Sequence, residues 1–239
     1  MMTNKHKDYP LKDYYSKIYP KYDLVNRVFT FGQDRRWRKS AVRECLQNQP
    51  SKVLDICTGT GDLVIDIARS AGEELQLHGY DFSSEMLGIA KEKADKQKAD
   101  IRFTEGNVAA MPYDNDFFDA AGITFGIRNL VYENSNADQH LEEIRRVIRP
   151  GGRLVVLESS RPDNRVWRLF NNIYLQYILP WLGGLISGNF KAYRYLASSS
   201  KNYYSIGEMA SILESAGFIA RKKKPLFMGS VMLIVAEKQ

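Results

Sequence analysis

The chain has 239 residues, of which 44% are hydrophobic and 26% are charged, and its formal net charge is +6. This composition excludes a disordered or fibrous protein and, at this length, favours a single compact domain. Two cysteines, Cys45 and Cys57, are too few for a disulfide framework, and the sequence has no zinc-type spacing of Cys and His, which predicts a cytoplasmic protein without a metal site. The basic surplus suits nucleic acid or an anionic membrane, but no nucleic-acid motif accompanies it, and a solvated basic face is the commoner cause.

Residues 1–50 are predicted to form a helical N-terminal cap. The stretch "LKDYYSKIYPKYD" (11–23) carries apolar and aromatic side chains at helical spacing, which indicates an amphipathic helix. The N-terminus is charged and aromatic and lacks the apolar centre of a secretory signal, so we expect it to remain on the mature protein.

From residue 51 onward, short apolar runs alternate with helical patterns. Strands are predicted at 52–56, 75–81, 101–107, 118–125 and 152–159, and helices at 62–71, 84–97 and 136–150. Strands separated by helices of this length call for parallel pairing with right-handed crossovers, hence an α/β doubly wound sheet. The chain then closes with a helix at 206–218 and two strands, 219–227 and 230–238, which are close enough to pair as an antiparallel hairpin.

An uncharged run of 22 residues, 169–190, complicates this pattern. It is long enough to span a bilayer, but Asn, Gln, Pro and Gly residues interrupt it, so a transmembrane helix is not expected. We interpret it as a helix plus a turn that covers an apolar pocket or touches a membrane surface. A buried core helix explains the pattern equally well.

The stretch "DICTGTGDL" (55–63) lies where a predicted strand turns into a helix. Gly59 and Gly61 permit a tight turn and close approach of a ligand to the unpaired amides of the helix. Asp81 follows Gly61 by 20 residues at the end of the next strand, where its carboxylate can accept both hydroxyls of a ribose. Val64 stands where a dinucleotide fingerprint has its third glycine, and Asp55 suits a cationic ligand better than a pyrophosphate.

A nucleoside with a ribose and a cationic amino-acid end is S-adenosylmethionine. The chain resembles the seven-stranded methyltransferase fold, a Rossmann-like sheet with an antiparallel C-terminal strand. The segments that carry this resemblance are "EGNVAAMPYDNDFFD" (105–119), on the adenine side, and "RPGGRLVV" (149–156), at the turn into the fifth strand.

Four further stretches resemble the ubiquinone and menaquinone biosynthesis C-methyltransferase family: "YDLVNRVFTFGQDRRWR" (22–38), "ITFGIRN" (123–129), "RVIRPGGRLVVLESS" (146–160) and "YRYLASS" (193–199). One departure is Asp34, where the family usually has a His. The resemblance covers nearly the whole chain and implies methyl transfer from S-adenosylmethionine to a ring carbon of a polyprenyl quinol, with no metal.

The resemblance also implies roles for particular residues. Positions that match family cofactor-binding positions are Thr60, Asp81, Asn107, Val108 and Thr124. The turn residues Asp55, Gly59 and Gly61, with Phe82 after Asp81, complete the predicted cofactor site. Positions associated with substrate and catalysis are Tyr22, Arg128 and Asn129.

Demethylmenaquinol is the first expected substrate. The alternatives are the 2-methoxy-6-polyprenyl-benzoquinol of ubiquinone synthesis, another aromatic or lipid molecule, and a binding or assembly protein that keeps the fold without catalysis. We expect a core at 51–160, a substrate-covering insertion at 161–205 and a C-terminal unit at 206–239. Peripheral contact with the inner face of an anionic membrane is expected, and a homodimer is left open.

Overall fold

The computed structural model describes residues 27, 30, 32–72, 74–187, 190 and 203–239. Tyr22, the predicted N-terminal helix and the "YRYLASS" stretch lie outside the described residues. In chain order the described elements are α3 (Asp34–Cys45), β1 (Lys52–Ile56), α4 (Asp62–Ala68), β2 (Gln76–Asp81), α5 (Ser84–Gln97), β3 (Arg102–Glu105), β4 (Phe118–Thr124), α6 (Ile127–Val131), α7 (Ala137–Val147), β5 (Ile148–Ser159), α8 (Arg165–Ile173), η2 (Tyr174–Ile178), α9 (Leu179–Ser187), α11 (Ile206–Ser215), β6 (Phe218–Leu226), η3 (Phe227–Gly229) and β7 (Val231–Lys238).

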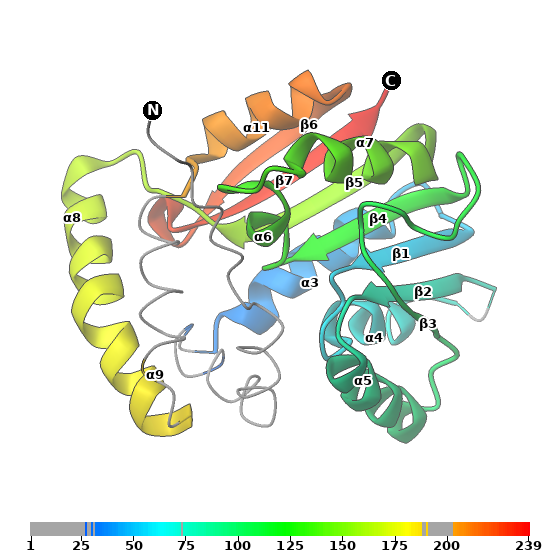
Figure 1. Cartoon of the computed structure of the whole chain (residues 1–239), viewed down its shortest axis with the longest axis horizontal. Helices are drawn as coiled ribbons and strands as arrows, with labels where there is room; N and C mark the ends of the chain where they lie inside the picture. Colours follow the sequence, from blue (N-terminus) through cyan, green and yellow to red (C-terminus); the bar gives the residue numbers. More distant parts are fainter. Residues whose placement is uncertain (1–26, 28–29, 31, 73, 188–189, 191–202) are drawn as a thin grey trace, which may run out of the picture.

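The strands form one seven-stranded sheet in the order β3-β2-β1-β4-β5-β7-β6 (Figure 1). The first five strands pair in parallel, whereas β7 pairs antiparallel with both β5 and β6. The predicted doubly wound sheet with an antiparallel C-terminal hairpin is therefore confirmed. The chain order reverses between β1 and β4, and ligands in open α/β sheets bind at the carboxyl ends of strands beside such a switch point.

Successive residues of the central strands face opposite sides of the sheet and enter two separate cores. On β1, Val53 packs with α3 and α4, while Leu54 packs on the opposite face with α6, α7 and α11. Both side chains are fully buried. This double burial explains why the central strands read as continuous apolar runs rather than as alternating patterns.

Three predicted helices end three residues early, the one expected at 62–71 at Ala68, and two of these differences have identifiable reasons. The helix expected at 136–150 ends at Val147, because Pro150 disfavours helical angles at the preceding residue and Gly151 takes a φ of +71°. The helix expected at 206–218 ends at Ser215, and Gly217, with a φ of +84°, turns the chain into β6.

Residues 165–187 form a continuous helical arm along one side of the molecule (Figure 1, yellow). The predicted turn does not occur between 169 and 187, since α8, η2 and α9 follow one another without a break. The π-helical turn η2 stands just before Pro180, which cannot donate the N–H that a regular turn needs. Among the described residues, no helix has the length and hydropathy required to cross a membrane.

Candidate active site

A cleft of about 950 Å³ opens at the carboxyl ends of β1, β2 and β4. Its walls come from the turn after β1, the start of α5, the turn after β3 and helices α3, α6 and α7. The predicted substrate residue Asn129 lines the cleft. So do seven of the residues predicted to bind the cofactor, namely Gly59, Thr60, Asp81, Phe82, Asn107, Val108 and Thr124.

The turn after β1 is braced from below by Asp55. This carboxylate is 1% exposed, and its Oδ2 accepts hydrogen bonds from Thr58 Oγ1 at 2.6 Å and from the Val64 amide at 3.2 Å. Gly59 and Gly61 have φ angles of +54° and +80°, which other residues rarely adopt. Asp55 and Gly61 do not line the cleft themselves; they fix the turn that does.

Asp81 joins the ends of β1 and β2. Its Oδ2 accepts the Gly59 amide at 2.8 Å and its Oδ1 accepts the Ser83 amide at 2.9 Å. Burial raises the pKa of this carboxyl group, and hydrogen bonds from the amides of Ser83, Gly59 and Phe82 oppose the rise. A carboxylate offers about four acceptor sites, so the three amides leave Asp81 able to accept a further donor such as a ribose hydroxyl.

The turn after β3 forms the wall beyond Asp81. Asn107 Oδ1 accepts the Ala109 amide at 2.9 Å, and the Tyr80 hydroxyl donates to the Asn107 carbonyl at 3.1 Å. These bonds fix the backbone at Val108, which is buried. Phe82 is 37% exposed at the cleft, where its ring offers a flat apolar surface to a base.

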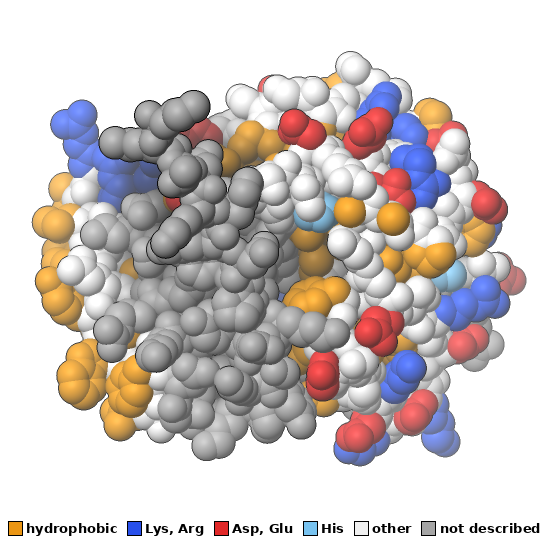
Figure 2. All heavy atoms as spheres, in the orientation of Figure 1, with side chains coloured by type: hydrophobic (Ala, Val, Ile, Leu, Met, Phe, Trp, Pro, Cys, Tyr) orange, Lys and Arg blue, Asp and Glu red, His pale blue; other side chains and the backbone are white. Residues whose placement is uncertain are grey.

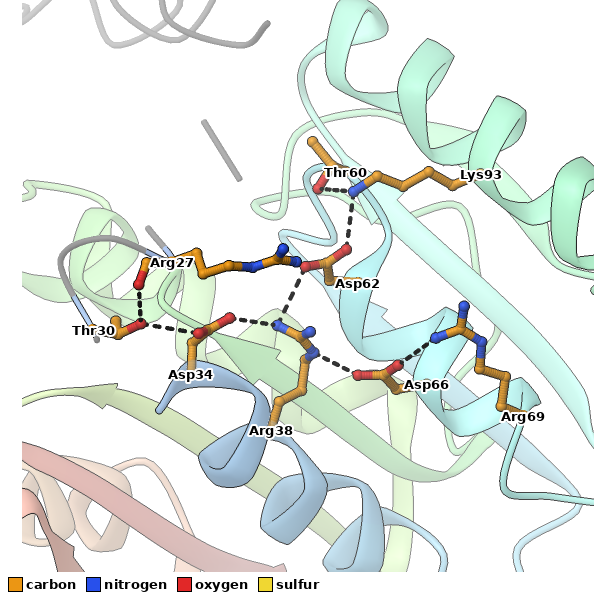
Figure 3. A network of polar contacts seen from close by, with 9 residues as sticks. All are labelled: Arg27, Thr30, Asp34, Arg38, Thr60, Asp62, Asp66, Arg69 and Lys93. Atoms are coloured by element: carbon orange, nitrogen blue, oxygen red, sulfur yellow. Dashed lines mark hydrogen bonds and ion pairs between the residues drawn. The ribbon is translucent and has the colours of Figure 1, made fainter. Parts of the chain in front are cut away.

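A network of charged side chains closes the other end of the cleft (Figure 3). Arg38 on α3 contacts Asp66 at 2.6 Å, Asp62 at 3.2 Å and Asp34 at 3.6 Å. Lys93 on α5 donates to Thr60 Oγ1 and to Asp62 Oδ1, both at 2.9 Å. The network therefore ties α3, α4 and α5 to the glycine turn, and Asp34 has a structural partner in Arg38.

The predicted substrate residues of α6 are split between two environments. Asn129 faces the cleft, whereas Arg128 is 6% exposed and does not line it. The Arg128 amide donates to Glu158 Oε2 at 3.4 Å, and Glu158 Oε1 accepts the Ser159 amide and hydroxyl, each at 2.8 Å. Glu158 thus braces the end of β5, as a buried carboxylate with backbone partners does.

Comparison with known proteins decides the family. A model of the ubiE/COQ5 methyltransferase family matches residues 1–238. The chain belongs to this family. It is 43% identical over 208 residues to a protein of Thermus thermophilus named demethylmenaquinone methyltransferase, covering 87% of this chain and 92% of that one. It is also 36% identical over 230 residues to the ubiquinone/menaquinone biosynthesis C-methyltransferase UbiE of Geobacter sulfurreducens, covering 95% and 88%.

The fold agrees with this assignment. A crystal structure from Thermotoga maritima, described as a SAM-dependent methyltransferase and possible histamine N-methyltransferase, superposes with a TM-score of 0.65 at 17% identity and covers 95% of this chain and 99% of that one. At this identity the likeness shows the fold alone. With the family match, it confirms the predictions of an S-adenosylmethionine-dependent methyltransferase and of its fold.

The cleft suits S-adenosylmethionine on its own chemistry. Two buried carboxylates, Asp55 and Asp81, lie at the turn beneath it, and within the described chain Asp55 Oδ1 has no hydrogen-bond partner. Because a nearby cation stabilises the ionised form of a buried carboxyl group, this pair favours a cationic ligand such as a sulfonium or an ammonium group. The residues present therefore fit this cofactor.

The cleft residues that the predicted site lacks include three with charged or titratable side chains from separate helices: Arg38, Lys93 and His140. Arg38 lies within a stretch that carries the family resemblance, but nothing in the sequence pairs it with Asp62 and Asp66. Lys93 reads as one of several charged positions on an amphipathic helix. Only the packing of α3, α5 and α7 around the sheet brings these side chains to the cleft.

Replacing Arg38 is expected to destabilise the protein, because three carboxylates then lose their shared cation. We expect Arg38→Met to lower the free energy of unfolding by about 1.5–3 kcal/mol, the range for hydrogen bonds to charged groups. Arg69→Met is the matched control: Arg69 contacts Asp66 at 3.1 Å with a 53% exposed side chain, and its loss should cost less than about 1 kcal/mol. Urea unfolding measures both, and equal losses would contradict this role.

Asp55 is expected to make stability depend on pH. Burial raises its pKa to about 7, Asp81 adds to the rise, and hydrogen bonds from Thr58 and Val64 oppose it. In the unfolded chain an Asp ionises near pH ~4, so the stabilisation by neutral Asp55 is present below that pH and is lost as the pH rises through about 7.

The free energy of unfolding of the wild type should therefore fall relative to that of Asp55→Asn between pH about 4 and about 7, and the difference should level off above this window. Urea unfolding across these pH values measures it. A difference that does not vary with pH would show that burial leaves the Asp55 pKa unchanged.

Proposed function

We propose that this methyltransferase transfers a methyl group from S-adenosylmethionine to a ring carbon of demethylmenaquinol. The observation that carries the proposal is the 43% identity, over 87% of the chain, to the protein of Thermus thermophilus named demethylmenaquinone methyltransferase. Relatives in Deinococcus radiodurans and Bacillus subtilis, 38% and 35% identical, carry the same name.

The bound cofactor supplies an electrophilic methyl group on a sulfonium. A reduced quinone ring is an electron-rich carbon nucleophile, so the new carbon–carbon bond forms as the methyl–sulfur bond breaks, and the ring then loses a proton. The chain has to hold the two reactants in line and exclude water. The braced turn at 57–61 and the carboxylate of Asp81 hold the cofactor side rigid.

We propose that the quinol ring binds beside α6 and the end of β5. Arg128 is buried there beside Glu158 and Tyr203. Burial raises the pKa of Tyr203, which keeps this phenol neutral, and the positive charge of Arg128 opposes the rise. Arg128 lies outside the cofactor cleft, so this proposal requires that the quinol reaches its guanidinium, which would stabilise a phenolate by charge-assisted hydrogen bonding. Asn129, at the cleft wall, orients a ring hydroxyl, and Tyr22 is proposed to share this role.

The methoxy-benzoquinol of ubiquinone synthesis is the second candidate, since the relative in Geobacter sulfurreducens is named for both pathways. Incubation with labelled S-adenosylmethionine and each chemically reduced quinone distinguishes the two. We expect label on the naphthoquinol ring, at a rate that drops at least about a hundredfold in Asp81→Ala, because the ribose loses its acceptors. Cofactor binding without transfer to either quinol would leave only a cofactor-binding protein or a different acceptor.

The helical arm exposes a continuous apolar face. Figure 2 shows hydrophobic side chains along the edge formed by α8 and α9, with Lys and Arg side chains near the start of α8. The most exposed are Val166, Leu169, Phe170, Tyr177, Trp181 and Leu185, each between 59% and 70%. Exposed apolar surface of this extent marks an interaction site.

We propose that this face rests on an anionic membrane, from which the polyprenyl substrate is drawn. The arm has no Asp or Glu from 165 to 187, and Arg165 and Arg168 lie in its first turn. Basic residues beside an apolar helix face bind anionic lipid, each adding about 1 kcal/mol near the surface. An uncharged apolar face also shields a polyprenyl tail from water.

Trp181→Glu tests this surface. We expect co-sedimentation with phosphatidylglycerol vesicles to fall at least about fivefold, because a charge replaces a 67% exposed indole in the α9 part of the face. Gln76→Glu, which adds the same charge at an exposed position at the start of β2, should bind as the wild type does. Unchanged vesicle binding and unchanged activity on long-tailed substrate in Trp181→Glu would exclude the membrane role.

The cytoplasmic location, the homodimer and the division into cap, core, insertion and C-terminal unit stay predictions. Light scattering of the purified protein measures the oligomeric state directly.

A further inference from the structure

His140 on α7 is a buried side chain that forms part of the cleft wall. It is 6% exposed, and its Nδ1 lies 3.0 Å from the Leu130 carbonyl oxygen. A carbonyl accepts but cannot donate, so Nδ1 carries the proton and the neutral ring keeps its lone pair on Nε2. The hydrogen bond therefore fixes both the tautomer and the orientation of the ring.

Nε2 of His140 has no hydrogen-bond partner in the part of the chain that the structure describes, and the residue lines the cleft. His78 provides the contrast, because both of its ring nitrogens are sealed from solvent without partners. Its ring packs edge-on against Tyr113, Phe117 and Phe118, and burial lowers its pKa to about 4. His78 therefore behaves as a neutral core residue, while His140 presents an acceptor to the cleft.

The neighbours of His140 place it beside the adenine side of the cleft. Gln139, the preceding residue, donates from Nε2 to the Ala109 carbonyl at 3.2 Å, and Glu143 accepts the Met111 amide at 2.6 Å. These bonds hold α7 against the turn that carries Asn107 and Val108. Val108, Leu130 and His140 all line the same cleft as Phe82.

We propose that His140 recognises the adenine base, with Nε2 accepting a hydrogen bond from the exocyclic amine. An adenine amine is a donor that needs an acceptor when it is buried, and a fixed neutral imidazole supplies one. A hypoxanthine base carries a carbonyl at this position, which would place two lone pairs against each other. His140 is thereby a specificity-determining residue of the cofactor site, an inference that rests on the proposed use of S-adenosylmethionine.

Calorimetric binding of S-adenosylhomocysteine and of its deaminated analogue, S-inosylhomocysteine, tests the assignment without turnover. The wild type should bind the adenine form about tenfold or more tightly than the inosine form. His140→Leu should weaken the adenine form about tenfold and change the inosine form less than about threefold, so that the preference disappears. Asp138→Leu, at an exposed position of the same helix turn, should keep the wild-type preference.

His140→Phe, which keeps a planar ring without an acceptor, gives a second variant and should behave as His140→Leu does. Equal weakening of both ligands in these variants would indicate a packing role and would overturn the proposal, as would an unchanged preference for adenine. A wild-type protein that binds neither ligand would overturn the cofactor assignment itself. If the wild type binds S-adenosylhomocysteine and His140→Leu binds it equally well, only the role of His140 is overturned.

Discussion

The hydrogen bond from the Gly59 amide to Asp81 Oδ2, at 2.8 Å, is the contact on which the rest of the site depends. It joins the turn after β1 to the end of β2, so neighbouring strand ends share one carboxylate. Asp55 supports the same turn from below through Thr58 and Val64. Burial raises the pKa of both carboxyl groups, and the charge of Asp81 adds to the cost of ionising Asp55. A cationic ligand relieves that cost, which links the stability of the turn to the chemistry of S-adenosylmethionine.

The cofactor cleft and the helical arm differ in polarity. The cofactor side is polar, braced by hydrogen bonds and closed by the ion-pair network around Arg38 (Figure 3). The helical arm is apolar, uncharged from Leu169 to Ser187 and exposed along its length. Arg128 and Asn129 follow β4, beside the cofactor cleft. The proposed transfer from a water-soluble cofactor to a polyprenyl quinol would use this separation between a polar cleft and an apolar surface.

The parts of this account that the sequence predicted depend on local pattern. The bounds of β1 and α5 agree with the structure because an apolar run and a capped amphipathic helix need no distant residue to define them. Asp81 was predictable because the ends of successive parallel strands meet at one edge of the sheet. Arg38, Lys93 and His140 were not, since only the packing of helices against the sheet brings them to the cleft. The sequence also did not predict the unbroken arm. A proline usually ends a helix, but here the π-helical turn η2 precedes Pro180 and the helix continues past it to Ser187.

The most direct measurement is a crystal structure of the protein with S-adenosylhomocysteine. The account predicts the ligand in the cleft above the Gly59 turn, with both ribose hydroxyls within about 3.2 Å of the Asp81 carboxylate and the base between Phe82 and Val108. A ligand bound elsewhere, or one whose ribose does not reach Asp81, would contradict the central claim that the joined ends of β1 and β2 form the cofactor site.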